Sequence, residues 1–341
     1  MNEDTKGTLI MSTKDAIHSR PSSKVLIQGY IIQTALVVTI AVLFLLIVFA
    51  PFLYPKTVGI FLVIPYLSYT LFIRRDEIKD GAHWPLFSNH FWIFNVMRQF
   101  LQLTIAPIPK ELANEEKKEG AQFVFGIFPH GSWADYRVLM DGMLPEVFPS
   151  THGKIKTLAA SVLFRMPFVR DVSLWTGCVD ARRAVAERQL DRGMSLLIIP
   201  GGEAEQIRTI YGKEVIFLKQ RKGFIKLAMC KGAAVVPSYV FGCSDYYRTS
   251  SFLFDVRVFF VKKLGVCLPL VAGYLGSPFC PLPVKTTIVF GKPMYFAIKE
   301  EGTPTIEEVD AAHAEFVESL NMLFNDNKVK FGYGDRELEI V

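Results

Sequence analysis

The hydrophobic positions form long apolar runs near the N-terminus and short runs separated by polar stretches after residue 120. The first long run, VLIQGYIIQTALVVTIAVLFLLIVFA (25–50), contains no charged residue. At about 1.5 Å per residue a helix of this length reaches roughly 39 Å, enough to cross the hydrocarbon core of a bilayer. We therefore expect a membrane-spanning helix here, preceded by a disordered, cytosolic polar tail over residues 1–24.

A second apolar run, residues 57–73, ends abruptly at Arg74-Arg75 and is interrupted by Pro65. Two interpretations stay open: a helical hairpin that returns to the starting side, or one span followed by a re-entrant segment. Basic residues flank both ends of the 25–75 region, whereas only Lys56 lies in its turn. Because cytosolic flanks are enriched in Lys and Arg, this distribution favours a transmembrane hairpin over residues 25–75 with both ends in the cytosol.

Two further apolar stretches carry interspersed polar residues. Residues 76–120 mix aromatic side chains with Asn, His and Arg and end in the charged stretch KELANEEKKEG (110–120), which indicates an interfacial segment followed by a linker. Residues 251–284 are apolar, punctuated by Pro and Gly, and carry Lys262-Lys263. We interpret the second stretch as a membrane-dipping segment, with a buried hairpin as the alternative.

The remainder, residues 121–341, has the pattern of an α/β domain. Short apolar runs at 121–128, 156–161, 174–180, 195–202, 233–242 and 285–293 have the composition of strands. They alternate with amphipathic patterns at 181–193, 218–232 and 306–324, and Asp180 is positioned to cap the first of these helices. Alternation of this kind predicts a largely parallel or mixed sheet flanked by helices.

Composition and charge narrow the chemistry. The five cysteines form no CxxC pair, so we expect reduced thiols and no metal site. The net charge of +5 is uneven: residues 151–235 carry fifteen Lys and Arg against seven Asp and Glu. This surplus suits phosphates or anionic lipid headgroups, with a merely solvated basic face as the alternative. The absence of a G-x-S-x-G elbow, a P-loop and a dinucleotide fingerprint argues against serine hydrolases and nucleotide-binding enzymes, and no nucleic-acid partner is expected.

His130 is the first candidate for catalysis. It follows a strand-like run, lies between Pro129 and Gly131, and precedes Asp135 in an H-x4-D arrangement. Since residues five apart lie on different faces of a helix, the pair can meet only across a tight turn, which Pro129 and Gly131 would make. A carboxylate on one ring nitrogen would leave the other free as a base.

Two other blocks supply further candidates, the glutamates as catalytic residues alongside His130, Asp135 and the Gly131 amide, and the glycines and cations as substrate-binding residues. PGGEAE puts Gly201 and Gly202 after a strand, where backbone amides can approach a substrate, with Glu203 or Glu205 as an acceptor. Cationic side chains near helix N-termini, where anions are favoured, are candidates for phosphate binding. The cations are Arg221, Lys222, Arg182 and Arg183, and Gly223, which follows Lys222, is a further candidate for substrate binding.

Taken in order, FPHG, PGGEAE, RKGFIKLAMCKGAAVVPSYVFG, VFGKP and KVKFGYGD resemble the type-2 diacylglycerol acyltransferase family from about Phe123 to the C-terminus. The H-x4-D spacing also resembles the broader glycerolipid acyltransferases. The resemblance implies a glycerolipid-acyltransferase-like fold and an endoplasmic-reticulum membrane enzyme with a cytosolic catalytic domain. The motif histidine of the family falls on His130 and its glycine-glycine-glutamate block on residues 201–205. Phe128 stands where animal members have another histidine, so His130 is the single candidate base.

The activity that the resemblance implies is transfer of a fatty acyl group from acyl-CoA, as co-substrate without a cofactor, to diacylglycerol. Monoacylglycerol and long-chain alcohol acyltransferases look alike at this level, so the acceptor stays open among the three. A lipid-binding or droplet protein without catalysis is the alternative from another class. Association with lipid droplets and homo-oligomerisation are open as well.

Overall fold

The structure, a computed structural model, describes residues 21–166, 168–264, 267, 269–297 and 303–341. Within them the largest sheet has the strand order β1 (Thr104–Ile105), β10 (Thr287–Phe290), β7 (Ala234–Phe241), β2 (Phe123–Phe128), β5 (Ser195–Ile198), β3 (Ile155–Ala159), β4 (Cys178–Asp180). Strands β7, β2, β5, β3 and β4 are parallel, whereas β10 runs antiparallel to β7 and β1 parallel to β10. The prediction of a mixed α/β sheet is confirmed.

Alternate side chains of the central strand β2 enter two separate cores. Phe123, Phe125 and Ile127 pack into one hydrophobic cluster, and Val124 and Phe128 into the other. All six residues of β2 are buried, as is typical of a parallel strand covered on both faces. The apolar run FVFGIF is continuous for this reason.

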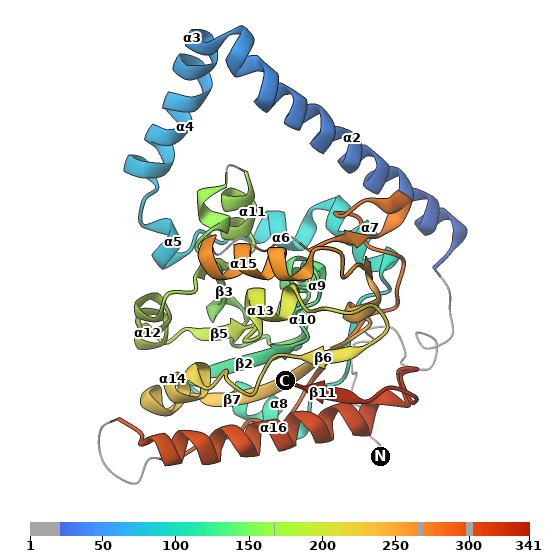
Figure 1. Cartoon of the computed structure of the whole chain (residues 1–341). Helices are drawn as coiled ribbons and strands as arrows, with labels where there is room; N and C mark the ends of the chain where they lie inside the picture. Colours follow the sequence, from blue (N-terminus) through green and yellow to red (C-terminus); the bar gives the residue numbers. More distant parts are fainter. Residues whose placement is uncertain (1–20, 167, 265–266, 268, 298–302) are drawn as a thin grey trace, which may run out of the picture.

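Helices cover both faces of this sheet (Figure 1). The first core contains residues from α7 (Trp92–Phe100), α8 (Lys110–Glu116), α9 (Asp135–Met140) and α10 (Leu144–Val147). The second core contains residues from α12 (Arg183–Asp191), α14 (Gly223–Lys231) and α16 (Ile306–Lys328). A capping box fixes the start of α16, since Glu308 N donates to Thr305 Oγ1 and Thr305 N to Glu308 Oε2.

Smaller elements complete the described body. These are α5 (Glu77–Asp80), α6 (Pro85–His90), α11 (Val169–Trp175), α13 (Gly202–Gln206), α15 (Phe254–Leu264) and the paired strands β6 (Glu214–Ile216) with β11 (Leu338–Ile340) and β8 (Arg248–Thr249) with β9 (Val271–Ala272). Short helical turns include η3 (Asp141–Met143) and η7 (Tyr274–Gly276).

The N-terminal apolar runs form two helical arms. The first arm is α2 (Ser23–Leu53), and the second comprises α3 (Pro55–Val58), η1 (Gly59–Val63), α4 (Ile64–Ser68) and η2 (Tyr69–Ile73). Figure 1 shows them meeting at α3 like an inverted V that stands away from the body. Among the residues that the structure describes, none of the helices combines the length and the apolar character needed to span a bilayer.

Several predicted boundaries differ from the structure. The helix expected over 218–232 begins only at Gly223, and the expected linker 110–120 contains α8, whose Leu112 and Glu116 are buried. Asp180 is not the N-cap of α12; that residue is Arg182, and the Asp180 carboxylate accepts from Arg182 N at 2.9 Å. The described residues of segment 251–284 form α15, β9 and η7, and its contact with a membrane stays a prediction. Most of the predicted tail, residues 1–20, lies outside the described residues.

Candidate active site

His130 lies two residues beyond the carboxyl end of β2, at the edge where ligand sites of parallel sheets gather. Its Nδ1 is 3.0 Å from the carbonyl oxygen of Gly131. Because a carbonyl oxygen can only accept, Nδ1 carries the hydrogen and Nε2 keeps its lone pair. Burial lowers the pKa of His130, which keeps the imidazole neutral near pH 7. The ring is therefore set up as a base at Nε2.

The loop that follows His130 requires glycine at position 131. Gly131 has φ +65°, and a Cβ there would lie 2.3 Å from Sγ of Cys243. Among the described residues, the Gly131 N–H donates to no acceptor. The Pro129 carbonyl accepts from the Tyr136 hydroxyl at 3.1 Å, which ties the loop to α9. The Gly131 N–H is thus available as a hydrogen-bond donor next to His130, the candidate base.

Asp135, the first residue of α9, does not hydrogen-bond His130 in the described structure. Its Oδ1 instead accepts from the Tyr247 hydroxyl at 3.0 Å, and its Oδ2 is buried without a partner among the described residues. Burial raises the pKa of Asp135 to about 6. The Gly131 carbonyl, not this carboxylate, orients the imidazole; a catalytic role for Asp135 stays a prediction.

Glu205, on α13, links the glycine-glutamate block to His130. The side chain is 1% exposed; Oε1 accepts from His130 N, and Oε2 from Phe217 N at 2.7 Å. Burial raises the pKa of Glu205 to about 7, against the lowering effect of the two backbone donors. A Cβ at Gly201 would lie 2.2 Å from the Glu205 carboxylate, so this position must stay small.

Two residues close to Glu205 in the sequence have different surroundings: Gln206 contacts the histidine loop, whereas Glu203 is more exposed than Glu205. Gln206 Nε2 donates to Ser132 O at 2.6 Å, so α13 holds the histidine loop twice. Glu203 is only partly buried; burial raises its pKa, and Arg221 opposes the rise. The sequence did not distinguish Glu203 from Glu205 as the functional acceptor, and in the structure Glu205 is the one that contacts the histidine loop.

The four predicted cations have different surroundings. Three are paired with carboxylates: Lys222 with Asp310 at 2.7 Å, Arg182 with Asp180 at 3.1 Å, and Arg183 with Glu187 at 2.7 Å.

Arg221 makes no ion pair with any described residue, and its Nη2 donates to Gly201 O at 3.3 Å. Its guanidinium lies over the Phe217 ring, 5.3 Å from the centroid, and its Nε is buried and unpartnered among the described residues. Arg221 is the cation that lies beside the glycine-glutamate block.

The C-terminus supports this block through contacts that the sequence did not reveal. Strand β11 pairs with β6, which leads directly into Phe217. Arg336 Nη1 lies 2.7 Å from the buried Glu214 carboxylate on β6, and Nη2 lies 2.9 Å from Asp245. The only sequence signal was the position of Arg336 directly after FGYGD.

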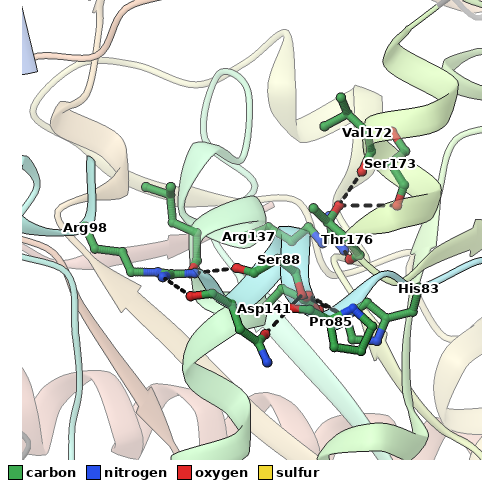
Figure 2. Close-up of polar contacts among 11 residues, drawn as sticks. His83, Pro85, Ser88, Arg98, Arg137, Asp141, Val172, Ser173 and Thr176 are labelled. Carbon is green, nitrogen blue, oxygen red and sulfur yellow. Dashed lines mark hydrogen bonds and ion pairs between the residues drawn. The ribbon is translucent and has the colours of Figure 1, made fainter. Parts of the chain in front are cut away.

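A buried polar network anchors the helix that follows the histidine loop. Figure 2 shows His83 beside Ser88 and Asp141, with Nε2 3.0 Å from Ser88 Oγ and 3.0 Å from Asp141 Oδ2. In the same view Arg137 of α9 reaches Thr176, with Nη1 2.9 Å from Oγ1. Both contacts of His83 use one ring nitrogen, so this is not a serine–histidine–carboxylate triad, in which the two partners use different nitrogens.

The described residues contain no group of three or more His, Cys, Asp and Glu side chains arranged to hold a metal ion. Within the described part of the chain, the candidate site consists of a histidine whose Nε2 has no hydrogen-bond partner, an adjacent backbone donor, a buried glutamate and an arginine without an ion pair.

Comparison with known proteins decides the family. The model of the family described as diacylglycerol acyltransferase matches residues 52–341. The chain belongs to the diacylglycerol acyltransferase family. This confirms the resemblance drawn from the ordered blocks.

Relatives within the family are named after different acyl acceptors. A protein named diacylglycerol O-acyltransferase 1 from Eremothecium gossypii is 31% identical over 79% of this chain, and the match spans 60% of that protein. Mouse diacylglycerol O-acyltransferase 2 is 30% identical over 78% of this chain and 68% of its own length. Mouse 2-acylglycerol O-acyltransferase 1 is 25% identical over 81% of this chain and 84% of its own length.

Among solved structures, the 1-acyl-sn-glycerophosphate (LPA) acyltransferase PlsC of Thermotoga maritima is similar over 78% of this chain and 91% of its own. The TM-score is 0.36 and the sequence identity 16%. A likeness at that level supports no inference about this chain.

Proposed function

We propose that this member of the diacylglycerol acyltransferase family transfers a fatty acyl group from acyl-CoA to diacylglycerol and so makes triacylglycerol. The observation that carries the proposal is the His130 imidazole at the carboxyl edge of the sheet, with Nδ1 on the Gly131 carbonyl and with Nε2 unpartnered among the described residues. The names of two relatives, from Eremothecium and mouse, agree with this acceptor. A monoacylglycerol acceptor is the second candidate, because another mouse relative is named 2-acylglycerol O-acyltransferase 1.

In the proposed reaction, Nε2 of His130 takes the proton of the acceptor hydroxyl as its oxygen attacks the thioester carbonyl. The resulting oxyanion lies near the Gly131 N–H, and the tetrahedral intermediate collapses to an ester and a CoA thiolate. The imidazolium returns its proton to that thiolate, so no covalent enzyme intermediate forms. General-base catalysis of this kind contributes about 10²–10⁴-fold, and one oxyanion donor about 10²–10³-fold.

The remaining residues would bind the CoA moiety. Arg221 is the first choice for its phosphates, since a guanidinium suits bidentate phosphate contacts and this one has no carboxylate partner among the described residues. Lys222, Arg182 and Arg183 would have to leave their present carboxylates to join it.

We further propose that the protein works on a membrane, namely that of the endoplasmic reticulum with the catalytic domain in the cytosol, and on lipid droplets. Helices α6, α11 and α15 lie on the side of the body that faces the two arms (Figure 1). Large apolar side chains are exposed on this side, among them Leu86, Phe168 and Phe259. Exposed apolar side chains on this side support contact with lipid, and the charge-free run 25–50 supports insertion of the first arm.

The test is a lipid-product assay on microsomes that contain wild-type protein or His130→Ala, with labelled oleoyl-CoA and diacylglycerol, monoacylglycerol or fatty alcohol in parallel. We expect triacylglycerol from the wild type and a loss of at least about 10²-fold in the variant. Wild-type rates in a membrane-inserted, folded His130→Ala protein would refute the proposal. Droplet formation that needs residues 25–75 but not His130 would favour a structural droplet protein instead.

A further inference from the structure

Two arginines lie beside one aromatic ring at the edge of the candidate site. Arg208 follows the end of α13 by two residues, and Arg221 lies in the segment that leads into α14. Each guanidinium carbon is 5.3 Å from the centroid of the Phe217 ring, so the two carbons are at most twice that distance apart. Arg208 was not among the cations predicted from the sequence. We call Arg208 and Arg221 the arginine pair.

Both members of the arginine pair are also anchored on α13. Nη1 of Arg208 donates to Ala204 O at 2.8 Å. Nη2 of Arg221 donates to Gly201 O at 3.3 Å. Gly201 O also accepts from Glu205 N, four residues on, so this carbonyl points along α13 as the carbonyls of a helix do. The shared ring and the two anchors on one helix therefore place both guanidinium groups in the same region.

Neither member of the arginine pair makes an ion pair with a residue that the structure describes. A guanidinium has five N–H donors, and each of these two uses one of them for a hydrogen bond to a described residue. Nε of Arg221 is buried without a partner among those residues. Buried donors are almost always hydrogen-bonded, and two positive charges close together repel each other. An anionic ligand at the arginine pair would satisfy the donors and offset the repulsion.

Phe217 connects the arginine pair to the histidine loop. Its N–H donates to Oε2 of Glu205 at 2.7 Å, and Oε1 of the same carboxylate accepts from His130 N. One carboxylate thus joins the residue beside the two guanidinium groups to the residue proposed as the base. Arg208, Phe217 and Arg221 are each partly exposed, so a ligand from solution can reach them.

A phosphate group suits the arginine pair best. It has several charged oxygens, which accept hydrogen bonds from the planar fork of N–H groups on a guanidinium. Contact with the face of an aromatic ring holds a guanidinium in place and leaves its N–H groups available for such an acceptor. Acylglycerols carry no charge, whereas acyl-CoA carries phosphates. Of the substrates in the proposed reaction, acyl-CoA is therefore the one that the arginine pair can recognise.

We propose that Arg208 and Arg221 together bind a phosphate group of acyl-CoA, with Phe217 holding both guanidinium groups next to the histidine loop. This inference rests on the proposed function and adds Arg208 as a second cation of the CoA site. The phosphate of an anionic lipid headgroup has the same chemistry, so the test includes both sources.

Arg208→Gln removes the charge and keeps an NH2 group that can donate to Ala204 O. The KM for oleoyl-CoA and the Kd for CoA should each rise about tenfold or more, because a charged hydrogen bond is lost. The KM for oleoyl-pantetheine, which lacks the CoA phosphates, should not change. Arg208→Lys keeps the charge without the planar fork and should give intermediate values. Since both arginines contact one group, Arg208→Gln combined with Arg221→Gln should raise the KM for oleoyl-CoA by less than the product of the two single effects.

The measurements are equilibrium binding of CoA, initial rates with both acyl donors, binding to vesicles with and without phosphatidate, and the thermal unfolding midpoint. Arg192→Gln is the matched control and should leave all values unchanged, because Arg192 is exposed and its partner Asp80 keeps Arg188.

Unchanged CoA binding and an unchanged KM for oleoyl-CoA in folded Arg208→Gln would overturn the proposal. If Arg208→Gln weakens binding to phosphatidate vesicles but not to CoA, the arginine pair binds a lipid headgroup and the assignment to acyl-CoA is wrong. A wild-type protein that binds CoA through both arginines but forms no triacylglycerol would refute the proposed function and still support the phosphate site.

Discussion

Replacing Glu205 by glutamine tests how the catalytic loop is held. Both carboxylate oxygens accept backbone N–H groups, one from His130 and one from Phe217. Glutamine keeps one acceptor oxygen and presents an NH2 donor in place of the other, so one N–H group must face another. We expect Glu205→Gln to separate α13 from either the histidine loop or Phe217.

The expected size of the effect on kcat follows from the burial of Glu205. Glu205 is 1% exposed, and a buried donor left without its acceptor costs about 1–3 kcal/mol. If the cost falls on the transition state because His130 moves, kcat drops by about 5- to 150-fold. The KM for acyl-CoA should change little, since Glu205 contacts only the protein backbone.

The pH dependence of the activity tests the role of Glu205 more specifically than the loss of kcat does. Burial raises the pKa of Glu205 to about 7, and the ionised form is the one that accepts both N–H groups. Activity should therefore fall as the pH drops through about 7, whereas His130, whose lowered pKa lies below 6.5, is still neutral there. In Glu205→Gln this acid limb should disappear, leaving only the lower one.

The free energy of unfolding should change with pH in the direction opposite to that of the activity. The folded-state pKa of Glu205 lies above its ordinary value of 4.5, so between pH 4.5 and about 7 the folded protein binds more protons than the unfolded one. The free energy of unfolding then falls with rising pH through this window, by about 3 kcal/mol from this group. Glu205→Gln should lack that slope.

The assay is kcat and kcat/KM of acyl transfer from pH 5.5 to 8.5, with unfolding midpoints at each pH. Glu318→Gln, an exposed carboxylate on α16, is the matched control. The reasoning fails if Glu205→Gln keeps both the wild-type rate and the acid limb, or if the limb disappears in Glu203→Gln instead.

Two further changes test the outer contacts of the site. Arg221→Ala should raise the KM for acyl-CoA about tenfold or more, because a charged hydrogen bond is lost. The KM for an acyl-pantetheine, which lacks the CoA phosphates, should not change. An equal rise in both KM values would contradict phosphate binding by Arg221. Arg336→Ala removes the cationic partner of buried Glu214, so the free energy of unfolding should fall by about 1–3 kcal/mol and kcat should fall with it. A stable, fully active variant would show that the C-terminus does not support the site.

The fold was predictable where local pattern and burial agree. FVFGIF and AVVPSYVF are predominantly apolar because β2 and β7 are covered on both faces, and the Thr305 capping box marks the start of α16. Strands β6 and β11 were missed because each has three residues and becomes a strand only by pairing with the other across more than a hundred residues. Helix α13 was missed because its glycines indicate a turn.

The site was predictable to the level of residue types but not of partners. The position of His130 after a strand and the glycine-glutamate block were visible in the sequence, yet spacing gave no means of choosing between Glu203 and Glu205. The link of Asp135 to Tyr247 spans 112 residues, so the nearer histidine was the natural but incorrect choice for its hydrogen bond. The short distance in sequence suggested a hydrogen bond between His130 and Asp135 that the described structure does not contain, and the bond between Asp135 and the distant Tyr247 was missed.

Local and distant segments therefore hold different parts of His130. The neighbouring Gly131 carbonyl fixes the ring tautomer, whereas Glu205, 75 residues away, holds the backbone N–H. Glu205 in turn depends on Phe217, which follows the strand that the C-terminal β11 completes. Disturbing β11 should thus displace His130 without changing its tautomer, so damage there should lower kcat while leaving the acid limb that belongs to the imidazole in place.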